Sequence, residues 1–269
     1  MTVDSETIKP AQIIAIGICF VIQMLDGMDV LVVAYAASQI TTEWGIPGKV
    51  YGGIFAAGVF GMTVGSFLLA PFADIVGRRK TILVAIAGIA AAVMLSAFAT
   101  DVTQMVVLRF VAGLGVGAAG PTLSTIAAEY SPPKYRDFVV LIIGAGYAVG
   151  AVCTGVVAAW IIPEYGWRTM FMAAGLATAI MLPLAYLLLP ESLEFLLKRR
   201  PPGAMEHANR ILPRLGRPLL SELPEVAVEQ RSGLGVSNLL APIRRTSTLC
   251  CWIAFFMVYA TVYLLLGWV

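Results

Sequence analysis

The chain has 269 residues, of which 59% are hydrophobic and 13% are charged, with a mean hydropathy of +0.87. A water-soluble fold could not bury so much apolar surface, so soluble domains are excluded and the lipid bilayer is the expected solvent. The net charge of +2 carries little information by itself, and we expect no nucleic-acid partner.

Seven apolar segments are long enough to cross a hydrocarbon layer about 30 Å thick, which requires a helix of about 20 residues. Short polar breaks separate the first six segments, and a long polar stretch precedes the seventh. The predicted spans are Ala11–Ser38, Tyr51–Ala73, Thr81–Ala99, Met105–Ala128, Phe138–Ile162, Thr169–Leu189 and Thr248–Val269. We therefore predict an all-α polytopic membrane protein with a six-helix bundle over residues 11–189.

The segments outside this bundle have a different composition. Residues 1–10 lack the basic and then apolar pattern of a cleaved signal peptide, so we expect the first span to be retained. Residues 190–247 contain charges of both signs and several prolines, which is typical of a linker between two bundles. Residues 248–269 are the predicted seventh transmembrane helix.

Positive charge is distributed unevenly between the two sides of the predicted spans. Of the 18 Lys and Arg residues, all except Lys49, Arg109 and Arg168 precede the first span or lie in the 2–3 loop, the 4–5 loop or the linker. The positive-inside rule places these segments in the cytoplasm. We predict a multi-pass protein of the cytoplasmic membrane, with residues 1–10 and the linker inside.

The residue types that enzymes and metal sites need are scarce or misplaced. The string from Gly115 to Gly120 matches the dinucleotide fingerprint G-x-G-x-x-G, but it lies inside an apolar span and not between a strand and a helix. The single histidine, His207, lies in the linker, and no cysteine pair has CxxC spacing. We expect no enzyme, no metal and no cofactor, and we interpret the four cysteines as small core residues: Cys19, Cys153, Cys250 and Cys251.

Glycines recur four residues apart in the fourth and fifth spans. Small residues at this spacing let membrane helices approach closely. We therefore interpret Gly113 with Gly117, and Gly146 with Gly150, as helix-packing seams. Such seams also permit helices to slide in a transporter.

Charged residues inside the spans form the candidate site. Asp26, Asp29 and Arg109 each cost roughly 2.5–3.5 kcal/mol or more at the bilayer centre, so they should face a cavity or one another. The spacing of three residues places Asp26, Asp29 and Gln23 on one face of the first helix. Helix rise places Asp29 and Arg109 at a similar depth, in the outer half of the membrane.

This cluster has two interpretations. It could be a permanent ion-pair staple between the first and fourth helices. The two acids for one base favour a second reading, in which one carboxylate takes up and releases a proton as the coupling ion. Either Asp26 or Asp29 could carry the proton, and the similar depth of Asp29 and Arg109 favours Asp29. Arg109 then suits bidentate capture of an organic carboxylate.

A second charged group follows the second span. Asp74, Gly77, Arg78 and Arg79 combine an acid, a turn glycine and a basic pair between two membrane helices. We interpret them as a conformational clasp at the cytoplasmic ends of the helices, with Glu129 and Arg136 nearby, although charge count alone also fits a purely topogenic basic cluster.

At this point the chain resembles the major facilitator superfamily, whose loop signature G-x-x-x-D-x-x-G-R-R/K is similar to residues 70–79. Leu108-Arg109-Phe110 with the following glycines, and Pro190-Glu191-Ser192, resemble two further motifs of that superfamily. Asp26-Gly27-Met28-Asp29 resembles the D-G-x-D of its aromatic acid:proton symporters. Two further stretches are similar to those transporters: Glu129–Pro132 with Arg136, and Gly166–Arg168 with Phe171. Ala70 and Ile75 depart from the loop signature and predict a looser clasp.

The resemblance implies proton-coupled uptake of small organic, mainly aromatic, acids by two six-helix bundles with the substrate between them. The alternatives are a sugar or dicarboxylate carrier of the same superfamily, or a non-transporting membrane scaffold or sensor. The expected partners are the organic acid, the bilayer and a C-terminal bundle. We expect this chain to contain the N-terminal bundle, the linker and the first helix of the C-terminal bundle, and to lack the rest.

Overall fold

The computed structural model describes residues 9–215, 218–220, 245–254, 256–257 and 261. The chain divides into two compact units, Met1–Leu223 and Pro224–Val269. The described residues of both units are helical or lie in short connections between helices.

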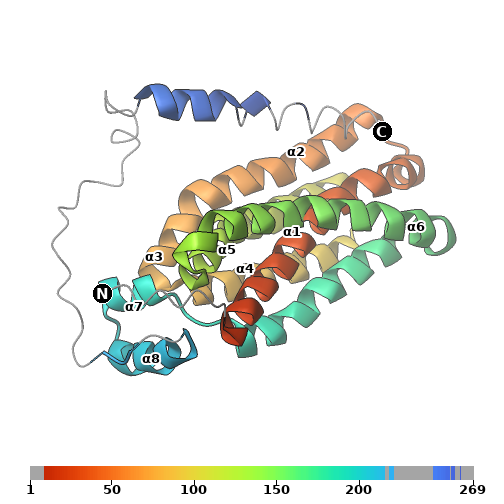
Figure 1. The fold of residues 1–269 in the computed structure, drawn as a ribbon. Helices are drawn as coiled ribbons and strands as arrows, with labels where there is room; N and C mark the ends of the chain where they lie inside the picture. Colours follow the sequence, from red (N-terminus) through yellow and green to blue (C-terminus); the bar gives the residue numbers. More distant parts are fainter. Residues whose placement is uncertain (1–8, 216–217, 221–244, 255, 258–260, 262–269) are drawn as a thin grey trace. The chain divides into compact units, whose positions relative to one another are not determined.

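The first unit is a bundle of long helices (Figure 1). Five helices of the described chain are long and apolar enough to cross a membrane. They are α1 (Pro10–Trp44), α2 (Gly48–Val64, continuing through short turns to Val76), α4 (Arg78–Ser96), α5 (Val102–Tyr130) and α6 (Arg136–Leu188). The turns that extend α2 are a π-helical turn at Gly65–Leu69, a 3₁₀ turn at Ala70–Phe72 and α3 (Ala73–Val76).

The last two predicted spans of the bundle are the two arms of α6. Gly166 adopts φ 80° and breaks the helix between Phe138–Ile162 and Thr169–Leu189. A side chain is strained in this left-handed region, so glycine suits the reversal. The six predicted spans are therefore all helical in the structure.

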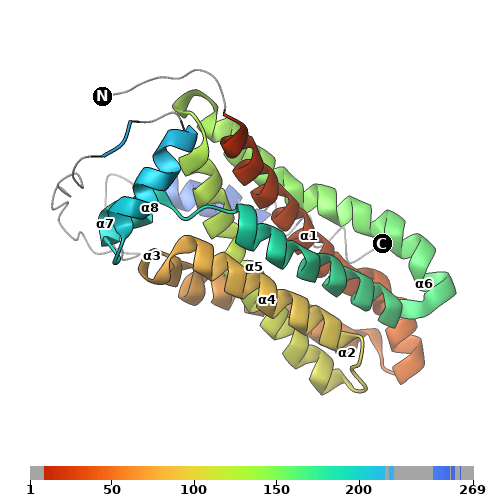
Figure 2. The same ribbon diagram turned by 90° about the horizontal axis from the view of Figure 1, so that it is seen from below.

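The helices pack in pairs around two apolar clusters. α1 runs along α6, α2 runs along α5, and α4 packs against α5 and α6 (Figure 2). One cluster includes Ile22 and Leu123. It lies towards the end of the bundle that carries Arg78, and we term this end of the bundle the Arg78 end. The other includes Val32 and Met105 and lies towards Trp167, at the Trp167 end.

The first part of the predicted linker belongs to the bundle unit. Residues after 190 form α7 (Leu193–Arg199), α8 (Ala204–Ile211) and a 3₁₀ turn at Leu212–Leu215. Their apolar side chains join the cluster at the Arg78 end, because short amphipathic helices can cover the ends of longer ones. The linker prediction for residues 190–247 differs from the structure here, and residues 221–244 lie outside the described part.

In the second unit, residues 245–254 are helical. The predicted seventh span, Thr248–Val269, thus begins inside a helix, and most of its later residues lie outside the described part.

The interpretation of the cysteines as core residues holds only for Cys19. Cys153, Cys250 and Cys251 are exposed. A membrane helix is apolar on all sides, so apolar neighbours in sequence do not separate core from lipid-facing positions.

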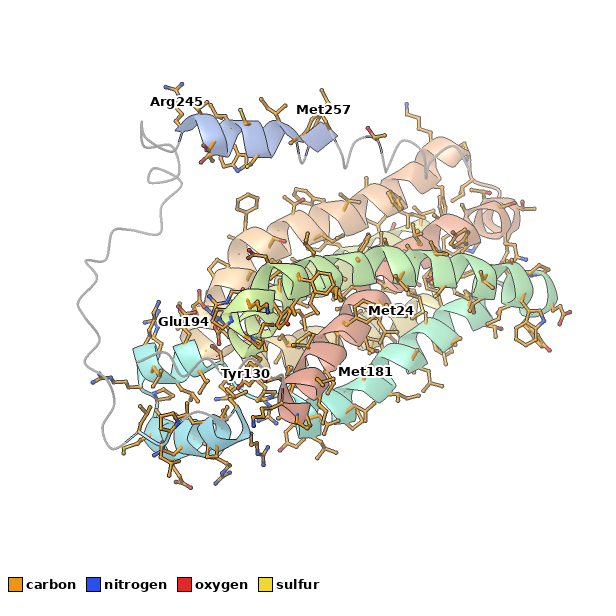
Figure 3. All side chains as sticks on the ribbon, viewed as in Figure 1. Met24, Tyr130, Met181, Glu194, Arg245 and Met257 are labelled. Carbon is orange, nitrogen blue, oxygen red and sulfur yellow. The ribbon has the colours of Figure 1, made fainter. Side chains whose placement is uncertain are left out.

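The predicted packing glycines lie where helices approach most closely. A Cβ at Gly113 or Gly117 would overlap backbone atoms of α2, at Gly58 and Met62. A Cβ at Gly150 would overlap the carbonyl oxygen of Met24 in α1, which is labelled in Figure 3. A Cβ at Gly146 would lie 3.1 Å from the nearest atoms of Phe20 in α1.

Replacing Gly150 with alanine should destabilise the bundle. The added methyl group meets backbone that cannot rotate away, so α1 and α6 must separate, at a cost of about 1–3 kcal/mol. We expect a lower thermal midpoint for the purified variant in detergent. Gly144→Ala is the matched control, because its Cβ would enter open space on the same helix. Equal midpoints for the two variants would contradict the close approach at Gly150.

Candidate functional site

The candidate site begins with two aspartates on one face of α1. Asp26 and Asp29 are both buried, between Ile22 of the cluster at the Arg78 end and Val32 of the cluster at the Trp167 end. They thus interrupt an otherwise apolar helix at the place where the two clusters meet.

Asp29 forms a buried ion pair with Arg109 of α5. The Arg109 Nη1 atom lies 2.9 Å from Asp29 Oδ1, and the two side chains are only 3% and 5% exposed. Such a pair is stable only when its geometry is good and its remaining polar atoms find partners. The structure thus brings together two of the residues that the sequence singled out.

Two further residues, neither of them predicted as a site residue, complete the surroundings of Arg109. Arg109 Nη2 donates a 2.8 Å hydrogen bond to Ser96 Oγ at the end of α4. The ring of Phe171 from α6 lies 5.1 Å from the guanidinium carbon, a cation–π distance. Arg109 Nε has no hydrogen-bond partner among the described residues. Ser96 had no sequence signal beyond its place in an apolar span; Phe171 was noted only by resemblance.

Asp26 forms no ion pair with any residue that the structure describes. Its Oδ2 atom is buried and lacks a hydrogen-bond partner within the described part of the chain. An ionised carboxylate in this position would be an uncompensated buried charge, which is costly. The sequence placed two acids and one base in this cluster. Because Arg109 neutralises Asp29, the carboxylate without a counter-charge in the cluster is that of Asp26.

Gln23 lies outside this hydrogen-bonded group. It is half-buried, and its Oε1 is 3.9 Å from the position of a Cβ at Gly120 of α5. In the described structure Arg109 donates hydrogen bonds to Asp29 and Ser96. Gln23 therefore lies on the same helix as Asp29 but does not bind Arg109.

A small cavity adjoins the ion pair. It has a volume of about 20 Å³ and is lined by Asp29, Arg109 and apolar residues of α1, α2 and α5. This is room for about one water molecule, far below the roughly 300–1,000 Å³ of ordinary ligand pockets. The cavity can hold a water beside the carboxylate, but not an aromatic acid. No group of three potential metal ligands occurs in the described residues.

A second polar group surrounds Arg78 at the start of α4. Arg78 forms ion pairs with Asp74, Glu129 and Glu194; its Nη2 atom is 2.9 Å from Asp74 Oδ1 and 3.1 Å from Glu194 Oε2. Ser192 joins them, since its hydroxyl donates to Glu129 and accepts from Arg78. We term these residues the Arg78 cluster. Figure 3 labels Glu194 and Tyr130 at this end.

Glu194 links this cluster to α7. The hydrogen bond from Lys198 lowers the pKa of Glu194; partial burial opposes this effect, and the charge of Arg78 adds to it. Glu194 therefore stays ionised at neutral pH and adds a third carboxylate around one buried guanidinium. Sequence reasoning missed Glu194, although it noted the preceding Pro190-Glu191-Ser192.

Gly77 and Arg79 connect to the same segment through Glu191. Gly77 adopts φ 117°, and a Cβ there would lie 2.8 Å from Glu191 Oε2. The backbone N–H of Arg79 donates to Glu191 Oε1 at 3.0 Å, while its guanidinium carbon lies 5.2 Å from the ring centroid of Tyr186. Arg79 thus binds the end of α6 and not the acids around Arg78.

Arg136 is separate from the Arg78 cluster. It donates to the carbonyl of Ala128 at 3.2 Å and lines an open pocket of about 510 Å³ with Glu129, Glu194 and Lys198. The expectation that Arg136 stands near the clasp therefore holds for its position, but the described structure records no ion pair between Arg136 and the cluster.

Removing the positive charge of Arg109 should destabilise the bundle strongly. Arg109→Met leaves Asp29 buried and unpaired, at a cost of roughly 3–5 kcal/mol. We expect this loss in unfolding titrations of the purified protein in mixed micelles, and we expect the double variant Asp29→Leu, Arg109→Met to regain most of it. The control is Arg210→Met, which breaks the exposed pair with Glu206 and should cost about 0–1 kcal/mol. Similar losses for Arg109→Met and Arg210→Met would refute the buried staple.

Comparison with known proteins finds aromatic-acid transporters among the relatives. The gallate transporter of Pseudomonas putida is 32% identical over 99% of this chain and 59% of its own length. The 4-hydroxybenzoate transporter PcaK of Pseudomonas aeruginosa is 29% identical over 99% of this chain and 60% of its own length. The benzoate transport protein of Acinetobacter baylyi is 28% identical, with 99% and 58% covered. The chain thus spans about 59% of the length of the first of these relatives.

Solved structures share the fold. The proton:xylose symporter XylE bound to 6-bromo-6-deoxy-D-glucose aligns with a TM-score of 0.69 and 21% identity over 77% of this chain and 50% of that chain. The inward-open xylose transporter XylE from E. coli aligns with a TM-score of 0.62 and 20% identity, covering 73% and 52%. The family model described as Major Facilitator Superfamily matches residues 19–269. A match over this much of the sequence, on a bundle of this architecture, means that the chain belongs to the major facilitator superfamily.

Proposed function

We propose that this chain supplies the N-terminal bundle of a secondary transporter that takes up small aromatic carboxylates together with protons. The relatives named for gallate, 4-hydroxybenzoate and benzoate support the substrate class. The observation that carries proton coupling is the buried cluster of Asp26, Asp29 and Arg109, with two acids and one base. The substrate would bind between this bundle and a second one, in keeping with the absence of a substrate-sized cavity beside Arg109.

Charge balance explains how such a cluster couples a proton to an anion. With Asp29 paired to Arg109, the cluster is neutral when Asp26 holds a proton and has a net charge of −1 when Asp26 releases it. A negative cluster repels an incoming carboxylate, whereas a neutral one does not. Anion binding and proton uptake therefore favour each other reciprocally. We assign the transported proton to Asp26 for this reason.

Arg109 has two roles in this proposal. It neutralises Asp29, and its unpartnered Nε–H gives the guanidinium one donor that a substrate carboxylate can use when the second bundle closes over the site. Contacts with Asp29, Ser96 and Phe171 hold the guanidinium group of Arg109 in one position. In this proposal the group attracts the substrate anion from that position, without a large movement of its own.

Proton coupling through Asp26 predicts a specific uptake defect. We expect Asp26→Asn, which cannot release a proton, to abolish proton-driven benzoate accumulation in cells that produce the whole gene product. Exchange of internal for external benzoate should survive, with a substrate affinity that no longer falls as pH rises. Asp137→Asn, at an exposed position of α6, is the control.

Three outcomes would count against the proposal. Normal accumulation by Asp26→Asn would remove this residue as the proton carrier. Inhibition of uptake by xylose but not by benzoate would favour a sugar carrier. The absence of uptake of any organic acid or sugar by the unaltered gene product would favour a scaffold.

We further propose that the Arg78 end faces the cytoplasm and that the protein lies in the cytoplasmic membrane. The support is the positive-inside rule, since most Lys and Arg residues flank this end. The Arg78 cluster then acts as a clasp at the cytoplasmic ends of the helices. Asp74 and Glu194 are partly exposed, so water can solvate these two acids when their pairs with Arg78 break, which suits a contact made in one conformational state.

This orientation predicts opposite labelling of the two ends. In a background without the four native cysteines, a cysteine at Arg214 should resist a membrane-impermeant thiol reagent added outside, and a cysteine at Asp101 should react. Permeabilised cells provide the control, since both positions should then be modified. Labelling of intact cells at 214 and not at 101 would reverse the proposed topology.

A further inference from the structure

The reversal in α6 is held by side chains of α1. At Gly166 the backbone leaves helical geometry, and the ends of two helical arms leave backbone groups that need partners outside the helix. The side chain of Gln39 binds two backbone groups here, as a donor to Ile162 O at 2.9 Å and as an acceptor from Trp167 N at 2.9 Å. One residue of α1 thus satisfies the backbone on both sides of the turn.

Trp167 is held in place by neighbours on several sides. Its indole Nε1–H donates to Glu43 Oε2 at 2.7 Å, and the same carboxylate accepts from Arg168 at 2.6 Å. The Arg168 guanidinium carbon lies 4.2 Å from the Trp167 ring centroid, and the Trp44 ring meets the indole edge to face at 5.8 Å. The indole is therefore buried in one orientation.

Phe171 connects this indole to the candidate site. Its ring meets the Trp167 ring edge to face, with centroids 5.8 Å apart, and is itself fully buried. The same ring faces Arg109, with 5.1 Å between its centroid and the guanidinium carbon. A continuous series of contacts runs from Arg168 at the surface through Trp167 and Phe171 to the pair of Arg109 with Asp29.

The geometry around Arg109 gives Phe171 a definite task. Asp29 and Ser96 each accept a hydrogen bond from one of the two Nη atoms of Arg109. The ring adds a cation–π contact, and such a contact is stronger at a desolvated site like this one than at the protein surface. An aliphatic side chain could fill the same volume, but it has no quadrupole to attract the guanidinium.

We infer that Phe171 is a positioning residue for Arg109, and that the aromatic link from Trp167 to Phe171 ties the buried ion pair to the reversal in α6. The ring holds the guanidinium in the orientation that binds Asp29 and leaves Nε–H free. Because Gln39, Glu43 and Asp29 all belong to α1, the link closes a circuit from α1 through α6 to Arg109 of α5 and back to α1. The consequence for transport rests on the proposed function; the consequence for the ion pair does not.

A double-mutant cycle tests the link without any transport assay. Phe171→Leu should lower the stability of the purified protein in an unfolding titration, but it should have a much smaller effect in the Arg109→Met background, where no cation faces the ring. Phe110→Leu is the matched control: Phe110 is the chain neighbour of Arg109, but its ring stacks on Phe60. Its effect should add to that of Arg109→Met. Additive effects for Phe171→Leu, or equal coupling for Phe110→Leu, would overturn the inference.

Uptake kinetics test the positioning role in the whole gene product. Phe171→Leu should raise the KM for benzoate about tenfold and change kcat less than about threefold, because a misplaced Arg109 attracts the anion less well. Phe171→Tyr keeps the aromatic face and should stay within about threefold of the unaltered KM. Equal KM values for the Leu and Tyr variants, or a loss confined to kcat, would refute positioning. If the unaltered protein takes up no aromatic acid, the proposed function fails and the double-mutant cycle alone decides the role of Phe171.

Discussion

The buried ion pair between Asp29 and Arg109 constrains the rest of the bundle. Two charges withdrawn from water are tolerated only where their geometry is good and their other polar atoms are satisfied. For Arg109, Ser96 at the end of α4 accepts a hydrogen bond from Nη2 and the Phe171 ring of α6 lies at a cation–π distance, while Nε has no hydrogen-bond partner among the described residues. The pair therefore joins α1 to α5, and the neighbours of Arg109 come from α4 and α6.

Close helix packing makes this arrangement possible. The glycines of α5 next to Arg109 let α2 approach within backbone contact, and Gly150 of α6 does the same for α1 beside Met24. In lipid there is little hydrophobic force between helices, so van der Waals packing and polar contacts must hold them together. The glycine seams bring α2 to α5 and α1 to α6, and the ion pair joins α1 to α5.

The two ends of the bundle are held by different chemistry. At the Arg78 end, one buried guanidinium is surrounded by Asp74, Glu129 and Glu194, and Asp74 is more than half exposed. At the Trp167 end, aromatic rings and the Gln39 side chain hold the reversal in α6. Ion pairs that water can replace suit contacts that open and close, whereas a buried aromatic link suits one that persists.

The sequence by itself determined the class of the protein and the identity of the central charges. Only a helix can satisfy its own backbone in lipid, so the apolar segments had to be helices and their lengths predicted the spans. The cost of burying Asp26, Asp29 and Arg109 marked them as a cluster before any contact was known. The spacing of three residues correctly placed both aspartates on the buried face of α1.

The tertiary structure alone decided which charges meet. Spacing along one helix shows which residues share a face, but the rotation of one helix against another depends on packing from several segments at once. For this reason the chain alone gave an ion pair to Arg109 only as one of two interpretations. It did not show the contact with Ser96, the cation–π contact of Phe171, or the separation of Arg136 from the Arg78 cluster. The packing of α7 and α8 on the bundle was hidden for a related physical reason: their polar composition resembles a linker, and only the burial of a few apolar side chains holds them in place.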